Sequence, residues 1–308
     1  MENHREAIMN WEMVLALAIG MDLLFGEPRE MFHPVVWIGK LIDAVRIHLN
    51  KSKLSGCVLA LTIPSIAALG GYLCTLMHGA IGMLVSAYVL KSTFSITCLT
   101  DTATRVYRHL ERDELVSAKK ELPALVGREP ERLTKEEMCS ATIESIAENF
   151  VDGILSPIFY FALFGLPGAL GYKAINTLDS MFGYKNQGDF GWASARLDDV
   201  VNYIPARLSV LFITMASAFH GSPLSALRVS RRDHDQTASP NSGWPMAAIA
   251  GALGVSLKKP FCYVLGDEFA LPEPQQIKKA VQIMRTSSII IIASALFILY
   301  YTKLPLVM

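Results

Sequence analysis

The feature that most constrains this chain is an apolar stretch from Leu54 to Leu90 that contains no Asp, Glu, Lys or Arg. The apolar character continues past Lys91 to Leu99. A helix needs about 20 predominantly apolar residues to cross a bilayer, so this stretch has room for two spans joined at residues 77–80. Soluble helices rarely stay apolar on every side. We therefore predict a transmembrane helical hairpin over about 54–99 rather than a buried pair of soluble helices.

The overall composition also favours a membrane protein. Charged residues make up 18% of the chain and hydrophobic residues 52%, whereas soluble globular chains carry about 25% charged residues. The formal net charge is +0, so no electrostatic argument indicates a nucleic-acid partner. The five cysteines include no C-x-x-C pair, so we expect neither a disulfide framework nor a zinc site.

The distribution of basic residues predicts which side of the membrane the loops occupy. Residues 100–149 are charged, have helical periodicity and are rich in Lys and Arg. The positive-inside rule places such a segment in the cytoplasm. The predicted hairpin returns residues 29–53, which are also basic, to the same side. An earlier apolar stretch, Met13–Met21, lacks a signal-peptide pattern and is too short to span a bilayer cleanly.

The second half of the chain contains interrupted apolar segments. Residues 153–172 are uncharged but broken by Gly165-Leu166-Pro167-Gly168, which favours two half-length helices in a re-entrant hairpin. Residues 208–227 are apolar and end at the breaker 220–223. The polar loop expected over 228–243 is basic, and a single span over 208–227 would place this loop outside, against the positive-inside rule. We therefore expect 208–227 to pair with 246–257 or to be buried.

These observations predict an all-α fold. It is a polytopic integral membrane helical bundle with broken or re-entrant helices and cytoplasmic helical loops. We expect one domain over residues 1–308, with an active-site core at about 144–257. A surface segment from about residue 258 then leads to a C-terminal span at about 286–302.

Three carboxylates form the first candidate site. Thr134 and Glu137 form a capping box that begins a helix. Glu144, Glu148 and Asp152 then follow at a spacing of four residues, which puts them in one stripe with about 6 Å between neighbours. Such a stripe beside an apolar segment needs a compensating cation, and oxygen ligands of this kind suit Mg²⁺. A solvated helix face with internal Lys or Arg partners is the alternative.

Three further groups of polar residues border the apolar segments. Residues 173–207 mix acids, bases and amides that suit a phosphorylated ligand and a metal, or a paired interfacial loop. In this segment Lys173, Asn176 and Asp179 are at helical spacing, and Asp198 or Asp199 is expected to share a helical face with Asn202. Arg231 and Arg232 precede the turn 239–245, where a helix begins; a helix N-terminus binds phosphate well, although a plain turn fits too. Asp22 closes an apolar run, and His33 is either a base or ligand or a structural residue. No Walker A, Rossmann or G-x-S-x-G motif occurs.

Five blocks of this sequence resemble the CobD/CbiB family of cobalamin biosynthesis. They occur in the family's order and cover residues 15 to about 270. They are Asp22…Gly26-Glu27-Pro28…His33-Pro34, Glu144-Ser-Ile-Ala-Glu148-Asn149…Asp152-Gly153, Lys173-Ala-Ile-Asn176-Thr-Leu-Asp179, Ala195-Arg196-Leu-Asp198-Asp199…Asn202…Arg207 and Ser239-Pro-Asn241-Ser242-Gly243-Trp244-Pro245…Val255. The chain departs from the family where Gly26-Glu27-Pro28 replaces Gly-Asp-Pro and Lys258-Lys259-Pro260 replaces Gly-Gly.

This resemblance implies an ATP-dependent amide ligase. The enzyme would join the propionate carboxylate of adenosylcobyric acid, an adenosylated corrinoid, to aminopropanol phosphate or aminopropanol. The product would be adenosylcobinamide phosphate or adenosylcobinamide, formed through an acyl phosphate with Mg²⁺ as cofactor. The resemblance also implies a multi-pass protein of the cell membrane, with an active site facing the cytoplasm and other late cobalamin-pathway membrane enzymes as partners.

The residues in the matching blocks receive roles from the same resemblance. Glu144, Glu148 and Asp152 are expected to bind Mg²⁺ and to act in catalysis. The other expected catalytic residues, which would hold a second metal or the amine, are Asp198 and Asp199. The expected substrate-binding or nucleotide-binding residues are Asp22, His33, Asn149, Lys173, Asn176, Asp179, Arg196, Asn202, Arg207, Arg232, Ser239, Asn241 and Ser242.

Two other classes of function remain open from the residues. A corrinoid-binding or transport protein without catalysis also carries acidic residues at the ends of its spans. A membrane phosphotransferase that acts on an alcohol headgroup would need a nucleotide-alcohol donor and no amine acceptor. Consumption of ATP in the presence of corrinoid and amine separates the ligase from both.

Overall fold

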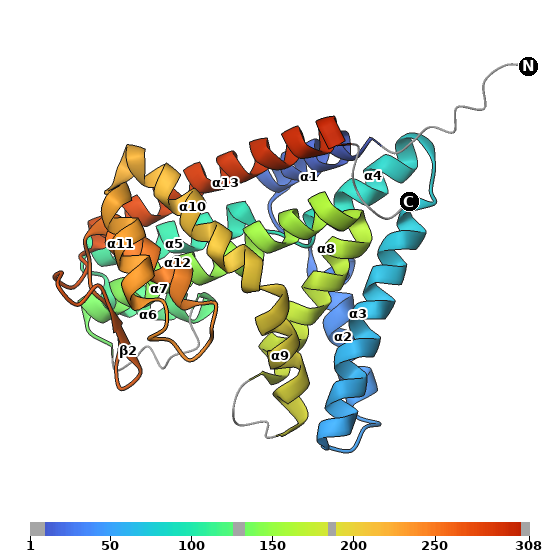
Figure 1. Cartoon of the computed structure of the whole chain (residues 1–308), viewed down its shortest axis with the longest axis horizontal. Coiled ribbons are helices and arrows are strands. Elements are labelled where there is room, and N and C mark those ends of the chain that lie inside the picture. Colours follow the sequence, from blue (N-terminus) through green and yellow to red (C-terminus); the bar gives the residue numbers. More distant parts are fainter. Residues whose placement is uncertain (1–9, 126–132, 184–188, 303–308) are drawn as a thin grey trace, which may run out of the picture. The chain divides into compact units, whose positions relative to one another are not determined.

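The computed structural model describes residues 10–125, 133–183 and 189–302 (Figure 1). Its α-helices are α1 (Trp11–Phe25), α2 (Pro34–Arg46), α3 (Lys53–Thr75), α4 (Gly79–Lys91), α5 (Ile96–Glu111), α6 (Leu115–Glu121), α7 (Lys135–Phe150), α8 (Ser156–Phe182), α9 (Trp192–Val201), α10 (Tyr203–His220), α11 (Pro223–Asp233), α12 (Gly243–Leu253) and α13 (Pro274–Thr302). Short 3₁₀-helices occur at η1 (Glu30–Phe32) and η2 (Leu122–Ala124), and a π-helix at η4 (Val151–Leu155). The strands β1 (Leu257–Lys259) and β2 (Tyr263–Leu265) pair antiparallel.

The long apolar helices make this an all-α polytopic membrane protein. By length and composition, four helical runs of the described residues can cross a membrane: Lys53–Thr75, Gly79–Glu111, Lys135–Phe182 and Pro274–Thr302. The pair Asp189–Val201 and Tyr203–His220, bent by 44°, passes the same test as one broken span. The predicted C-terminal span is confirmed. Its helix already begins at Pro274, however, so residues 274–285 belong to that helix and not to a separate surface segment.

The described chain divides into two compact units. Unit 1 lies within residues 1–95, 156–201 and 292–308, and unit 2 lies within 96–155 and 202–291. Because the chain alternates between the units, neither is a contiguous stretch of sequence. The predicted active-site core, about 144–257, contributes residues to both. A single membrane domain over 1–308 stays a prediction.

In unit 1, α3 packs along α8, with α2 and α9 beside them (Figure 1). Ile42, Leu59, Leu178 and Phe182 belong to the buried cluster between these helices. The first helix of the predicted hairpin and the connection near Met77 are confirmed. The second helix ends earlier than predicted, at Lys91, because residues 92–95 form a turn before α5; this second helix packs mainly against α1.

Helix α8 contains the predicted break. Gly165 has φ 64° and ψ −155°, a conformation that is essentially restricted to glycine. The rings of Tyr160 and Tyr172 stack with centroids 5.3 Å apart, whereas a continuous helix would separate them by about 18 Å along its axis. The two arms therefore fold back on each other. The second arm continues to Phe182, beyond the predicted end at Tyr172.

In unit 2, helices α10, α11 and α12 pack against one another, and α7 packs against α5, α12 and β1. The predicted pairing of 208–227 with 246–257 is confirmed in the contact of α10 with α12. The polar loop predicted over 228–243 is wrong in its first part, because α11 continues to Asp233. This helix buries Ala226, Val229, Ser230 and Asp233, the spacing of one helical face, and it presents its arginines on the other face.

Candidate functional site

Glu144, the first of the three predicted carboxylates, is buried and already hydrogen-bonded. The capping box of Thr134 and Glu137 is formed, so α7 begins where the sequence predicts. Glu144 is 4% exposed. Its Oε1 accepts a hydrogen bond from Ser140 Oγ at 2.8 Å, and its Oε2 accepts one from Tyr263 Oη at 2.7 Å. Lys258 N donates to the same Ser140 hydroxyl at 2.9 Å, so Glu144 fastens the β-hairpin to α7.

The other two carboxylates have different surroundings from Glu144. Glu148 is exposed near the end of α7, and Asp152 is half-buried in η4. The predicted α-helical stripe is therefore wrong at its last member, since α7 ends at Phe150 and a π-helix changes the angle between successive residues. Asn149 donates to Ser145 O at 2.9 Å, within its own helix. These facts make Glu148 and Asp152 the accessible acids of the group.

No group of three or more His, Cys, Asp or Glu side chains that could hold a metal ion is present in the described ranges. Mg²⁺ commonly binds through one or two carboxylates together with substrate phosphates and water. The oxygen chemistry of Glu148 and Asp152 fits that mode. The assignment of Mg²⁺ to Glu144, Glu148 and Asp152 stays a prediction.

The predicted polar residues of α8 and α9 lie in unit 1. Lys173 Nζ donates to Asn176 Oδ1 at 3.2 Å on the second arm of α8, where Asp179 also lies. On α9, Arg196 Nη1 lies 3.2 Å from Asp199 Oδ2, one residue beyond Asp198. The helical spacing predicted for Lys173, Asn176 and Asp179 is confirmed. Asn202, predicted to share a face with Asp198 or Asp199, lies beyond the end of α9 and is buried at the start of α10.

Arg207 of α10 is the centre of a stack of side chains in unit 2. Its guanidinium carbon lies 3.4 Å from the ring centroid of Tyr203 and 5.2 Å from that of Trp244. The Trp244 ring in turn stacks on His234, with centroids 3.8 Å apart. Arg207 Nη1 donates to Tyr203 O at 2.7 Å and to Asn241 Oδ1 at 3.3 Å. The structure thus brings together the predicted residues Arg207 and Asn241.

The turn before α12 supplies the other predicted polar groups of this region. Ser239 Oγ accepts from Asn241 N at 3.2 Å, and Ser242 Oγ donates to Thr237 Oγ1 at 3.3 Å. Gly243 begins the helix, and a Cβ at this position would collide with the carbonyl oxygen of His234. Only glycine lets the end of α11 and the start of α12 approach this closely. Hydroxyls, a helix N-terminus and the Arg207 guanidinium therefore lie in one region.

Arg232, also predicted to bind substrate, has its guanidinium occupied by carboxylates. It lies 2.6 Å from Asp233, 3.0 Å from Asp267 and 2.6 Å from Glu268. Burial by itself raises the pKa of Asp233, but the hydrogen bonds from Arg232 and Gly266 N and the Arg232 charge bring that pKa below its usual value. The hydrogen bonds to Asp233 and Glu268 raise the pKa of Arg232. This arrangement fits a structural ion-pair network better than a ligand site.

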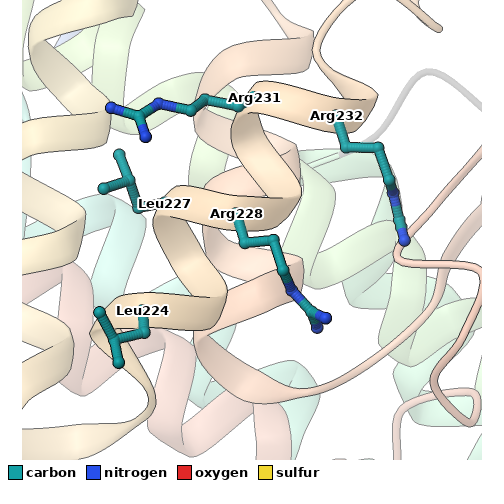
Figure 2. Close-up of a pocket in the computed structure, with 5 residues that line it drawn as sticks. All are labelled: Leu224, Leu227, Arg228, Arg231 and Arg232. Carbon is teal, nitrogen blue, oxygen red and sulfur yellow. The ribbon is translucent and has the colours of Figure 1, made fainter.

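An open hollow of about 490 Å³ lies along α11 beside this network. Figure 2 shows its lining residues, Leu224, Leu227, Arg228, Arg231 and Arg232, with Arg231 directed away from the other two arginines. Arg228 lies 3.0 Å from Glu268. The positive charge of Arg228 and Arg232 is thus largely balanced by acids, so the hollow is a weaker anion site than its three arginines suggest.

The predicted residues Asp22 and His33 meet in unit 1 around a buried lysine. Lys91 is 1% exposed, and its Nζ lies 3.3 Å from Asp22 Oδ1 and 3.0 Å from Glu27 Oε1. His33 Nε2 lies 3.0 Å from Glu27 Oε2, while its Nδ1 accepts from Val35 N at 3.2 Å. Because both ring nitrogens are engaged, His33 acts here as a structural residue that orients Glu27 and caps α2.

The pKa of Glu27 in this group is strongly lowered. Burial raises its pKa, but the hydrogen bond from His33 and the Lys91 ammonium outweigh that effect and lower the pKa to about 2. Sequence reasoning did not single out Glu27 or Lys91 as site residues. A lone lysine inside an apolar stretch was the available signal for Lys91, because a charge in such a stretch needs a partner.

Four aromatic or histidine contacts were also missed. Tyr203, His234 and Trp244 contact the Arg207 region, and Tyr263 contacts Glu144. His234 and Trp244 stand beside predicted residues, but their types give no local signal of stacking. Tyr263 is far from Glu144 in sequence, so only the fold brings them together.

The fold and these groups define a polytopic all-α membrane protein with an arginine-centred polar region next to its apolar helices. The chain belongs to the CobD/Cbib protein family, whose model matches residues 15–287. A probable cobalamin biosynthesis protein CobD of Methanothrix thermoacetophila is 40% identical over 291 residues, covering 88% of this chain and 91% of that protein. Cobalamin biosynthesis protein CobD of Dehalococcoides mccartyi is 36% identical over 303 residues, covering 95% and 98%.

A third relative, cobalamin biosynthesis protein CobD of Geobacter metallireducens, is 42% identical over 255 residues, covering 79% of this chain and 80% of that protein. No solved structure matches the chain significantly. Family membership over most of the chain assigns this protein a role in cobalamin biosynthesis.

Proposed function

We propose that this protein is an ATP-dependent amide ligase of cobalamin biosynthesis. It joins the propionate carboxylate of adenosylcobyric acid to the amine of aminopropanol phosphate or aminopropanol. A carboxylate oxygen first attacks the γ-phosphorus of ATP, which forms an acyl phosphate and releases ADP. The amine then attacks the acyl carbon, inorganic phosphate leaves with the C–O bonding electrons, and the nitrogen loses a proton to give the amide.

The observation that carries this proposal is the Arg207 region. Its residues belong to the sequence blocks that resemble the family, and they gather into a cationic group with hydroxyls and a helix N-terminus. Helix α10, which carries Arg207, also packs against η4, which carries Asp152. A ligase of this kind needs a cation for phosphate oxygens and acids for a metal, and unit 2 contains both.

Glu148 and Asp152 are the acids best placed for this role. These carboxylates would hold Mg²⁺, whose chemistry would be to neutralise phosphate charge. Glu144 holds the β-hairpin in place, and Asn149 supports the end of α7. Roles in binding the corrinoid, ATP or the amine remain proposed for Asp22, Lys173, Asn176, Asp179, Arg196, Asp198, Asp199 and Asn202. We also propose that the site faces the cytoplasm, and that other late cobalamin-pathway membrane enzymes are partners.

The reaction is tested by mass spectrometry of the purified protein in lipid nanodiscs. The assay contains adenosylcobyric acid, ATP, Mg²⁺ and aminopropanol phosphate, with aminopropanol in a parallel sample. A product at the mass of the amide, with ATP consumed in equal amount, is expected. Bound corrinoid with neither product nor ATP consumption would refute the ligase and favour a binding or transport protein.

The role of the acids is tested by Glu148→Gln. We expect turnover to fall about 100-fold or more, because loss of a charge that contacts the metal in the transition state has an effect of this size, while the helical circular dichroism is unchanged. Glu136→Gln is the matched control, since Glu136 is exposed on the same helix outside the motif. Full activity of Glu148→Gln would remove this acid from the mechanism.

A further inference from the structure

We propose that the stack formed by Tyr203, Arg207, Trp244 and His234 is a preformed subsite for a phosphate monoester, in which the aromatic residues position the Arg207 guanidinium. This inference rests on the proposed function and adds the ligand class of one part of the site. It also adds three positioning residues that the sequence motifs did not assign.

The first argument is that Arg207 is held rigidly. Arginine normally loses considerable side-chain entropy when it is fixed, and the stack removes that cost before any ligand binds. The guanidinium lies over the ring of Tyr203 and over that of Trp244, an arrangement in which each ring face attracts the cation. Two hydrogen bonds from Nη1, to Tyr203 O and Asn241 Oδ1, fix its rotation.

The second argument is that donors in this region lack acceptors. Within the part of the chain that the structure describes, Nε and Nη2 of Arg207 have no hydrogen-bond partner, and no carboxylate forms an ion pair with this arginine. The indole Nε1 of Trp244 is buried and also has no acceptor among the described residues. A buried donor without a partner costs about 1–3 kcal/mol. An acceptor-rich ligand supplies what both side chains lack.

The third argument concerns the shape and charge of that ligand. A guanidinium fork donates two parallel hydrogen bonds to oxygens of one phosphate. The turn at Ser239 and Ser242 and the N-terminus of α12 add hydroxyls and helix-dipole charge, which also favour phosphate. The described structure gives no second cation in contact with this stack. One fixed guanidinium matches one phosphate monoester better than it matches the several charges of a triphosphate chain.

Two ligands of the proposed reaction carry a terminal phosphate: a phosphorylated amino alcohol, which is a monoester as proposed, and the nucleotide, whose triphosphate chain would overturn the monoester assignment. Steady-state kinetics distinguish them. If Arg207 contacts the phosphorylated amine, Arg207→Lys raises KM for aminopropanol phosphate about 10- to 100-fold, the loss of one charge-assisted hydrogen bond. The KM values for ATP and for unphosphorylated aminopropanol then stay within about twofold. If Arg207 contacts the nucleotide, KM for ATP rises with either amine.

A binding experiment keeps this proposal separate from the ligase proposal. Tryptophan fluorescence of the full chain in nanodiscs is titrated with inorganic phosphate, aminopropanol phosphate and aminopropanol, without ATP or corrinoid. Both phosphates are expected to change the emission with saturation, and aminopropanol is not. Trp244→Phe keeps a stacking ring but removes the N–H donor, so it should weaken phosphate binding about 3- to 10-fold. Phosphate binding by Trp244→Phe is measured by isothermal calorimetry, because this variant lacks the Trp244 indole whose fluorescence reports binding.

Two variants serve as matched controls. Arg46 lies over the Phe182 ring in unit 1, with 5.2 Å from its guanidinium carbon to the ring centroid. Arg46→Lys therefore changes an arginine that also contacts an aromatic ring but lies outside the subsite. Trp192→Phe removes an indole that is stacked by Lys53. Both should bind phosphate like the unaltered protein. Phosphate binding without catalysis would support the subsite and refute the ligase.

Several results would overturn the subsite. One is catalysis by the unaltered protein without saturable phosphate binding. Another is equal phosphate affinity in Arg207→Lys, Trp244→Phe and the unaltered protein. Thermal unfolding of each variant shows whether it is folded. If Arg207→Lys does not fold, Trp244→Phe decides the outcome alone.

Discussion

Arg207 and Arg232 lie in the same unit, but their guanidinium groups have different surroundings. Both were predicted from the sequence to bind substrate. Arg232 lies against three carboxylates, Asp233, Asp267 and Glu268, and its charge is satisfied inside the protein. Arg207 lies over the rings of Tyr203 and Trp244, and within the described part of the chain its hydrogen bonds go to a carbonyl and an amide oxygen. An aromatic ring holds a guanidinium without neutralising it, so Arg207 keeps its charge for a ligand.

The comparison shows how the surroundings divide one residue type between structure and binding. Replacing Arg232 should lower the free energy of unfolding, because Asp233 stays buried without its partner. Among the described residues no carboxylate is paired with Arg207, so replacing Arg207 leaves none of them without a partner. Replacing Arg232 should therefore change mainly the free energy of unfolding, and replacing Arg207 should change mainly the affinity for phosphate.

The largest expected difference in the free energy of unfolding is that between the variants Arg232→Met and Arg207→Met. Asp233 is 1% exposed, and removing the partner of a buried charge typically costs 3–5 kcal/mol. Because the Arg232 side chain is 43% exposed, we expect about 2 kcal/mol for Arg232→Met and about 1 kcal/mol or less for Arg207→Met. Chemical unfolding in detergent, followed by circular dichroism, measures both.

Arg231→Met is the control for this pair. It removes an exposed arginine of the same helix that has no ion pair among the described residues, so its stability should match that of the unaltered protein. A larger loss in Arg207→Met than in Arg232→Met would contradict the division of roles.

The acid dependence of stability should differ between the same two variants. The lowered pKa values of Asp233 and Glu268 mean that the folded state binds protons less readily than the unfolded state. Their stabilisation is therefore complete above the unfolded carboxyl pKa of about 4 and is lost as pH falls below it. The gap in unfolding free energy between the unaltered protein and Arg232→Met should shrink from pH 6 to pH 3.

Over that pH range, the gap between the unaltered protein and Arg207→Met should stay constant, because no carboxylate is paired with Arg207 in the described structure. Glu27, whose pKa is about 2, is present in every variant and cancels in these differences. A gap for Arg232→Met that does not depend on pH would show that its carboxylate partners do not account for the effect.

The smallest expected effect is that of Glu268→Gln. Glu268 contacts both Arg228 and Arg232 but is partly exposed, and exposed ion pairs contribute about 0.2–1 kcal/mol. Arg232 keeps Asp233 in this variant. The same unfolding experiment should give a loss below 1 kcal/mol, with phosphate binding unchanged. A loss as large as that of Arg232→Met would mean that Glu268, and not Asp233, is the main partner.

Much of the fold could be predicted because its signals are local. The apolar stretch after Lys53 predicts α3, Gly165 with Pro167 predicts the break in α8, and Thr134 with Glu137 predicts the start of α7. The error over 228–243 came from the many charges of this segment, which concealed the buried face of α11. The error at Asp152 came from assuming α-helical geometry across a π-helix.

The site was predictable in its members but not in their roles. The sequence blocks gathered the residues that belong to this family, including Arg207 and Asn241. They gave no indication that His33 has both ring nitrogens engaged or that Glu144 holds a β-hairpin through Tyr263. These roles depend on contacts between residues that are distant along the chain.

The sequence by itself determined that this is a helical membrane protein with a role in cobalamin biosynthesis, because hydropathy, helix signals and motif residues are properties of the chain read in order. Only the tertiary structure decided which charges are satisfied internally and which are left for a ligand. The physical reason is that the energy of a charge depends on its partners and its burial. Neighbours such as Trp244 for Arg207, or Lys91 for Asp22, are set by packing and not by position in the chain.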